Sequence, residues 1–306
     1  MILIYCLKGI FAFMLAQELI DVAYDAIKLP FSYFIDPKKR IYVFYLSMSF
    51  LIAFIIYTKN IRKKSFLRFI FFKRVWLGKS AQIDYALLVI NGFIKVLLIS
   101  PMVFLGIYLQ ELTTGSLEAF FGAVTIDIDR NTIVLMYTIL IWLFGDFASF
   151  YLHYLFHKIP FLWEFHKTHH SATTLNPFTL YRIHPVELLI NNFKSIIVFG
   201  LSTGIFYYLA NGKVGIIGFL GVNVFKFIFL SLGANLRHSH IRFTFPSWLE
   251  HIFISPYQHH IHHSKDETHY NKNLGSHLAI WDLMFHTLII SKRVRKIQFG
   301  LGNNSN

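Results

Sequence analysis

The chain has 306 residues, of which 55% are hydrophobic and only 15% are charged, and its mean hydropathy is +0.50. This composition favours a membrane protein over a soluble one, and the single cysteine, Cys6, excludes an intramolecular disulfide and a thiolate metal cage. The formal net charge of +13 predicts no nucleic-acid partner, because the Lys and Arg residues lie beside apolar runs, as the positive-inside rule describes.

Six apolar runs follow one another along the chain. The first, at 1–20, is interpreted as retained, because it has one positive charge and no small-residue cleavage site; it either spans the membrane or lies along the interface. The runs at 41–57, 86–109 and 132–156 are candidates to cross the hydrocarbon core, which needs about 20 residues. The last two, 195–210 and 214–233, are joined by Asn211-Gly212-Lys213, which predicts a tight helical hairpin in the bilayer. We therefore expect an all-α, multi-pass helical membrane protein.

The charged loops predict the orientation of these runs. Residues 59–79 carry eight basic residues and no acidic one, which places this loop in the cytoplasm. The net acidic loop at 111–129 then lies on the other side of the membrane. Alternation returns the end of the 132–156 run, and everything from residue 238 onward, to the cytoplasm. The sequence therefore predicts a cytoplasmic cap.

All sixteen histidines follow residue 152, and most of them fall into three clusters. The clusters are His153 and His157, then His166, His169 and His170, then His259, His262 and His263, with His260 inside the last. Residues three or four apart share one helix face, so their imidazoles can converge, and imidazole is a preferred ligand of zinc, copper and iron. Eight imidazoles are too many for one ion, so the clusters predict a two-metal site.

The set of donor atoms favours iron that activates O2. Zinc hydrolases usually use three protein ligands and a water, and soluble di-iron proteins use carboxylates, of which few lie near these clusters. Two alternatives stay open. One is a non-enzymatic membrane protein such as a metal transporter or metal-stabilised scaffold, although a transporter would place its ligands within the spans. The other is a zinc enzyme that acts hydrolytically.

Further motifs accompany the clusters. They are Asp146-Phe-Ala-Ser-Phe-Tyr-Leu-His153-Tyr-Leu-Phe-His157, Trp163-Glu-Phe-His166-Lys-Thr-His169-His170, Arg182-Ile-His184-Pro-Val-Glu187, Arg237-His238-Ser-His240, Ser255-Pro-Tyr-Gln-His259-His-Ile-His262-His263, His269-Tyr-Asn-Lys-Asn273-Leu-Gly275 and Trp281-Asp282-Leu-Met-Phe-His286-Thr287. In this order and spacing, residues 132–290 resemble the membrane fatty acid hydroxylase/sterol desaturase superfamily of non-haem di-iron oxygenases. The chain departs from the usual pattern at His286, where many members have Gly, and at Leu274, where many have Tyr.

The resemblance implies a four-helix membrane core, a cytoplasmic cap and two iron ions held by histidines, with O2 as co-substrate. The implied ligands are His153, His157, His166, His169, His170, His238, His259, His262, His263 and His269. The implied reaction is hydroxylation, or less often desaturation, of an unactivated C–H position of a fatty acyl, sterol or alkylglycerol lipid. The sequence shows no haem or flavin module, so we expect a separate electron donor of the cytochrome b5, ferredoxin or pterin type.

Three regions are expected: an N-terminal membrane-spanning region at 1–131, the catalytic domain at 132–290 and a C-terminal tail at 291–306. Around the clusters, Asp146 is expected to orient a ligand, since it lies two turns before His153 on one helix face. Arg182 is expected to pair with Glu187, with His184 as a structural anchor. The other histidines, His240, His251, His260, His277 and His286, are expected not to bind metal.

Overall fold

The computed structural model describes residues 2–60, 65–123 and 128–302, with side chains from residue 17 onward. The fold is helical, as predicted, and its strands are limited to β1 (Gly218–Phe219) and β2 (Val222–Asn223), which pair antiparallel. The predicted basic triplet at 62–64 and the last residues of the predicted tail, 303–306, lie outside the described residues.

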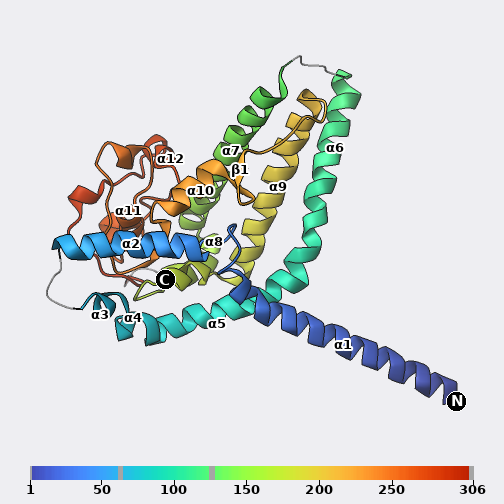
Figure 1. Ribbon diagram of the computed structural model, residues 1–306, viewed down its shortest axis with the longest axis horizontal. Coiled ribbons are helices and arrows are strands. Elements are labelled where there is room, and N and C mark those ends of the chain that lie inside the picture. The colour runs from blue at the N-terminus through green and yellow to red at the C-terminus, as the bar shows by residue number, and fades with distance from the viewer. Residues whose placement is uncertain (1, 61–64, 124–127, 303–306) are drawn as a thin grey trace.

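Three long helices form an upright bundle (Figure 1). They are α6 (Val103–Phe121), α7 (Arg130–Lys158) and α9 (Pro185–Leu209), and α9 packs against both of the others. Asp129 caps α7 by accepting hydrogen bonds from the backbone N–H groups of Asn131 and Thr132. Pro185 occupies the first turn of α9, where its missing N–H costs nothing.

Small residues allow α6 and α9 to approach each other closely. A Cβ atom on Gly200 would lie 2.7 Å from Cγ of Leu109, and one on Gly204 would lie 2.8 Å from the backbone oxygen of Gln110. The glycines are four residues apart on one face of α9, a spacing common where membrane helices cross. Thr114 Oγ1 also donates a hydrogen bond to the backbone oxygen of Gly204 at 3.1 Å, which joins the two helices inside the apolar contact.

Within the described residues, three helical stretches are long and apolar enough to cross a membrane: Lys79–Phe121, Arg130–Lys158 and Pro185–Leu209. The first is not straight. It runs from α5 (Lys79–Ile94) through a π-helical turn (Lys95–Ile99) and a 3-10 turn (Ser100–Met102) into α6. Pro101 has no N–H to donate, and Figure 1 shows α5 lying across the base of the bundle and α6 rising from it. The span predicted at 86–109 is thus divided between two helices, and α6, at about 28 Å, matches the hydrocarbon thickness.

The tight helical hairpin predicted at 195–233 does not form. Its first arm is the upper part of α9, but the second arm is a loop, the β1–β2 turn and the short helix α10 (Val224–Ser231). Gly215, Gly218 and Gly221 lie in this arm and disfavour a helix. The four-helix core implied by the resemblance therefore has three long helices in the described part, with this returning segment as its fourth element.

Thr138 on α7 satisfies the irregular backbone of the returning segment. The backbone N–H of Ile217 donates to Thr138 Oγ1 at 2.8 Å, and the Asn223 side chain donates to the Thr138 backbone oxygen at 2.9 Å. Thr138 is fully buried. Non-helical backbone at membrane depth is tolerated where protein groups bond it in this way.

The N-terminal helices surround the base of the bundle. The 1–20 run belongs to α1 (Ile2–Ser32), which extends away from the bundle in Figure 1, and the 41–57 run forms α2 (Val43–Asn60), which is followed by α3 (Phe66–Ile70) and α4 (Lys73–Leu77). Tyr33 and Ile41 pack with Leu88 of α5 and Tyr181 in one buried cluster. This contact joins the N-terminal helices to the histidine-bearing half of the chain.

The remaining elements form a cap at the base of α7 and α9 (Figure 1). They are α8 (Pro160–His170), α11 (Pro256–His262), α12 (Ile280–Met284) and 3-10 helices at Pro177–Tyr181, Ala234–His238, Leu249–His251, Glu267–His269 and Ser291–Arg293. The helices α3 and α4, which belong to the predicted cytoplasmic loop at 59–79, lie on the same side of the bundle as the cap. The predicted tail packs on the cap, because Val294 clusters with Tyr257 and Ile261.

Candidate metal centre

The three histidine clusters meet where α7, α8 and α11 converge. Pro160 starts α8 directly after α7 ends at Lys158, so the chain reverses and returns a second set of histidines to the first. A capping box between Ser255 and Gln258 begins α11 immediately before His259. Local start and stop signals therefore fix where each cluster lies.

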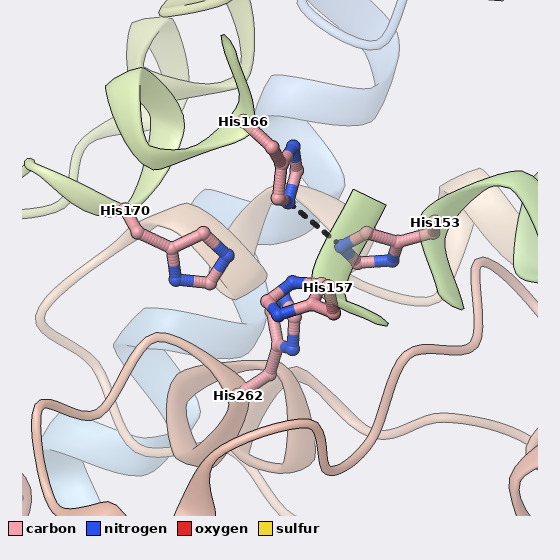
Figure 2. A group of neighbouring side chains, drawn as sticks. All are labelled: His153, His157, His166, His170 and His262. Carbon is pink, nitrogen blue, oxygen red and sulfur yellow. Dashed lines mark hydrogen bonds between the residues drawn. The ribbon is translucent and has the colours of Figure 1, made fainter. Parts of the chain in front are cut away.

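Five histidines form the first group, whose ligand nitrogens all lie within 4.8 Å of one another. Figure 2 shows these side chains converging from three helices. The members of this five-histidine group are His153 and His157 from α7, His166 and His170 from α8, and His262 from α11.

Four histidines form a second group with the same spacing limit. The members of this four-histidine group are His169 from α8, His238 from a 3-10 helix, and His259 and His263 from α11 and its C-cap. The two groups are adjacent, since the ring centroids of His170 and His263 are 4.7 Å apart. Nine of the ten predicted ligands thus come together in two neighbouring sets.

Hydrogen bonds fix the tautomers of several rings. Nδ1 of His153 donates to the backbone oxygen of Leu274 at 2.8 Å, and Nδ1 of His262 donates to that of Lys272 at 3.0 Å. Nδ1 of His169 donates to the backbone oxygen of Arg182 at 3.3 Å, and Nδ1 of His166 to Glu187 Oε1 at 2.9 Å. A ring whose proton is on Nδ1 presents a lone pair on Nε2, which is the form that binds a metal ion.

One contact shows that the five-histidine group fits a metal ion. Nε2 of His153 and Nε2 of His166 are 3.0 Å apart (the dashed line in Figure 2), yet both rings carry their proton on Nδ1. Two lone pairs at this distance repel unless a cation lies between them. Metal–nitrogen bonds of about 2.1 Å at an angle of about 90° place two ligand nitrogens about 3.0 Å apart.

Unsatisfied nitrogens support the same interpretation. Nε2 of His157, His170 and His262 is buried without a hydrogen-bond partner. In the four-histidine group, Nδ1 of His238, His259 and His263 is buried without a partner, and Nε2 of His259 lies 3.1 Å from Nε2 of His238 and 3.2 Å from Nε2 of His263. Buried polar nitrogens without partners are costly, so this set of donors fits metal ions at both groups.

Burial keeps these imidazoles neutral. Desolvation lowers the pKa of His166 and of His169 to about 3, and it lowers the pKa of His262 and His263 well below the usual value. At neutral pH their lone pairs are therefore available to a metal ion without competition from protons.

The predicted pairing of Arg182 with Glu187 is wrong. Arg182 Nη1 lies 3.2 Å from Asp84 Oδ1 of α5 and also donates to Ser80, whereas Glu187 accepts from His166. Asp84 is further held by Asn176 and Thr179. This fully buried network fixes the loop whose Arg182 backbone oxygen orients His169.

Asp146 does not contact either histidine group, contrary to the prediction. Its carboxylate accepts four hydrogen bonds, from the backbone N–H and Nδ1 of His277, the backbone N–H of Leu278 and Nε1 of Trp281, at 2.7 to 3.0 Å. Asp146 therefore anchors the Trp281 segment of the cap to α7.

Asp282 supports the metal centre in a role that was not predicted. Its carboxylate accepts from the backbone N–H groups of Leu274 and Gly275 at 2.7 and 2.8 Å and from Thr287 Oγ1 at 2.6 Å. The backbone oxygen of the same Leu274 orients His153. The Trp281-Asp282 motif was visible in the sequence, but nothing in its spacing indicated this connection.

His269, the tenth predicted ligand, lies outside both groups, and its Nδ1 is 3.0 Å from Ser264 Oγ. The remaining histidines have other partners. His184 caps α9 by accepting from the backbone N–H of Val186, His260 Nε2 donates to the Leu236 oxygen, and His240 and His251 bond backbone oxygens at the surface. His286 has φ +57°, a left-handed conformation that explains why Gly is common at this position in the resembling family.

Two cavities flank the histidines. One, of about 280 Å³, opens beside the five-histidine group and is lined by His157, Trp163, His170 and the C-terminal residues 300–302. The other, of about 230 Å³, reaches both groups between α7 and α9 and is lined by Ser149, His153 and Lys194. The paired groups are therefore accessible from the cap and from the interior of the bundle.

The fold and site define a helical membrane protein with two adjoining histidine groups whose geometry suits metal ions. Residues 138–287, slightly less than half of the chain, match the fatty acid hydroxylase family model. The chain is 30% identical over 158 residues to the ornithine lipid hydroxylase OlsE of Rhizobium tropici, an alignment that covers 51% of this chain and 43% of that protein. The chain thus spans less than half the length of this curated relative. No solved structure matches the chain.

Proposed function

We propose that the protein is an O2-dependent hydroxylase that uses two iron ions to oxidise an unactivated C–H bond of a membrane lipid. The observation that carries this proposal is the pair of adjacent histidine groups, held at the base of an apolar helical bundle within the fatty acid hydroxylase region. The match of residues 138–287 to the fatty acid hydroxylase model supports hydroxylase chemistry. Desaturation of the same class of substrate is the less frequent outcome of such a centre.

The two groups hold one ion each. The five-histidine group binds through Nε2 atoms, and the Nδ1 atoms of three of its rings, His153, His166 and His262, are held by backbone oxygens and Glu187. The four-histidine group binds the second ion. We assign nine ligands and leave His269 outside the set, because its Nδ1 is bonded to Ser264. When bound, iron supplies the activation of O2 that oxidation of an unactivated C–H bond requires.

The chain itself positions the substrate and shields the reaction. The cavity between α7 and α9 lies on the bundle side of both histidine groups, so a lipid can reach the centre from the membrane-spanning part of the bundle. The cap, fixed to α7 through Asp146 and Trp281, covers the other side and limits the entry of water. The histidines remain ligands and do not act as general bases, because a coordinated nitrogen has no free lone pair.

The domain organisation and orientation are parts of the same proposal. Residues 132–290 form the catalytic domain, preceded by a membrane-spanning region at 1–131 and followed by a tail at 291–306. The cap faces the cytoplasm, which is supported by the basic residues Arg68, Lys73 and Arg74 of α3 and α4, helices on the cap side of the bundle. Electrons come from a separate donor, of the cytochrome b5, ferredoxin or pterin type.

The test is metal analysis combined with lipid analysis. The full chain, purified in detergent, is expected to contain close to two iron ions per molecule. Membranes of cells that express it are expected to contain a lipid that is 16 Da heavier, and 18O2 is expected to label that lipid. Stoichiometric zinc with an O2-independent product indicates a hydrolase instead, and bound metal with no lipid change under aerobic conditions contradicts the enzymatic proposal.

A further inference from the structure

Several charged side chains line cavities in the helical bundle and belong to neither histidine group. The cavity beside the histidines and a second one of about 370 Å³ further into the bundle share Ser149 and Lys194 as lining residues. The two cavities therefore adjoin each other, one beside the histidines and the other among the long helices. We call the pair the bundle chamber.

The bundle chamber contains more cations than carboxylates. Four cationic side chains line it, Arg40, Lys194, Lys226 and Arg237, against the two carboxylates Glu187 and Asp146. Asp146 already accepts four hydrogen bonds, and Glu187 is bonded to His166. Metal ions held by neutral histidines would add further positive charge.

These cations lack ionic partners. The ion pairs found among the described residues include none of the four. Arg237 is only 4% exposed, donates to backbone oxygens of Ser276 and Ile254, and keeps its Nε without a partner. Lys194 Nζ donates to Ser149 Oγ at 2.8 Å, which leaves two of its three donors free.

Lys194 lies close along the helices to residues that hold or neighbour the histidine ligands. Lys194 is two turns along α9 from Glu187, which holds His166, and its partner Ser149 is one turn from His153 on α7. Seven residues of helix advance about 10 Å. An ionisable side chain that faces a cavity inside a membrane bundle marks a ligand or substrate path more often than a structural feature.

We propose that the bundle chamber binds the anionic group, phosphate or carboxylate, of the lipid that is oxidised, with Lys194 as its central contact. An anion at this position compensates the unpaired charge of Lys194 and the neighbouring Arg40, Arg237 and Lys226. It also fixes how far the lipid extends toward the histidines. Lys194 is therefore a residue that determines substrate specificity, and this role rests on the proposed lipid hydroxylase function.

The experiment measures binding of three amphiphiles with the same chain to the full-length protein in an uncharged maltoside detergent. The probes are dodecyl phosphate, dodecanoate and dodecanol. We expect at least one anionic probe to bind about tenfold more tightly than dodecanol, and high salt to weaken only that probe. A stronger effect of phosphate or of carboxylate identifies which anion the chamber accepts.

Variants locate the site. Lys194→Met is expected to abolish the preference for the anion, Lys194→Arg to retain it, and Lys213→Met, at an exposed lysine near the opposite end of α9, to leave it unchanged. Equal binding of all three probes to the unaltered protein would overturn the proposal. So would an unchanged preference in Lys194→Met. Where Lys194→Met does not fold, the salt dependence of the unaltered protein and the Lys194→Arg variant still decide.

This experiment is independent of the proposed reaction. Binding is measured without O2 or reductant, so loss of hydroxylase activity in other tests leaves it interpretable. Conversely, failure of the anion site leaves iron content and oxygen incorporation as they were, since Lys194 belongs to neither histidine group.

Discussion

Adjacent histidines in this protein serve different groups. His169 belongs to the four-histidine group and His170 to the five-histidine group, and the same division separates His263 from His262. Neighbouring residues on a helix point about 100° apart, so each His-His pair can reach two ions from one helix. A single substitution is therefore expected to remove a ligand from one ion and none from the other.

His262→Ala is expected to reduce bound iron from close to two toward one per molecule and to abolish lipid oxidation. His251→Ala, at an exposed histidine that bonds only the Ser247 backbone oxygen, serves as the matched control and should retain both ions. Metal analysis of the purified variants checks this. Two ions and normal turnover in His262→Ala would remove that residue from the ligand set.

Asp282→Asn is expected to destabilise the protein by about 1–3 kcal/mol, because an amide cannot accept from all three donors that the carboxylate serves, and one buried donor loses its partner. Because Leu274 orients His153, the variant should also lose iron to a chelator faster than the unaltered protein. Thermal unfolding and chelation rates measure the two effects. A lower unfolding temperature with unchanged chelation would limit Asp282 to a structural role.

The sequence predicted the convergence of the histidines because helical spacing is a local property. It did not predict their partners. Asp84 lies 98 residues before Arg182, so no spacing rule indicated that pair. The prediction that Arg182 pairs with Glu187 rested on their closeness in the sequence, and it was wrong. Asp146 was likewise assigned to the histidines from its helix face, although four donors from the distant 277–281 segment occupy it. Long-range hydrogen bonds depend on packing that a single sequence does not contain.

At the level of elements, the contact of α6 with α9 depends on glycine. Gly204→Ala is expected to destabilise the protein by about 1–3 kcal/mol, since its Cβ would lie 2.6 Å from Cβ of Thr113 and 2.8 Å from a backbone oxygen that cannot move away. Gly115→Ala in α6 has nothing within 4 Å and should stabilise its helix by up to about 1 kcal/mol. Thermal unfolding of both variants in one detergent tests the opposite signs, and a stabilised Gly204→Ala would contradict the packing.

The number of apolar runs overestimated the number of long helices. Hydropathy alone does not distinguish a helix from the glycine-containing segment at 210–223, which Thr138 holds in an irregular conformation. It also does not locate the bend at Pro101, where one apolar run becomes two helices in different directions. Both features depend on the backbone properties of single glycine and proline residues, which hydropathy averaged over a window of residues does not report.

At the level of the whole molecule, the cap and the far end of the bundle should lie on opposite sides of the membrane. In a Cys6→Ser background, Lys265→Cys in the cap and Lys213→Cys after α9 are both exposed positions. A membrane-impermeant maleimide added to intact cells should label Lys213→Cys and should label Lys265→Cys only after the cells are permeabilised. The reverse pattern would place the cap outside the cytoplasm.

The division of each His-His pair between the two groups has a consequence for assembly. The first ion to arrive fixes α8 and α11 in place, and these are the same two helices that supply most donors to its neighbour. The conformational entropy lost when α8 and α11 become ordered therefore opposes binding of the first ion only. If both groups take up iron, titration of the metal-depleted protein with ferrous iron should accordingly show that the second ion binds more tightly than the first.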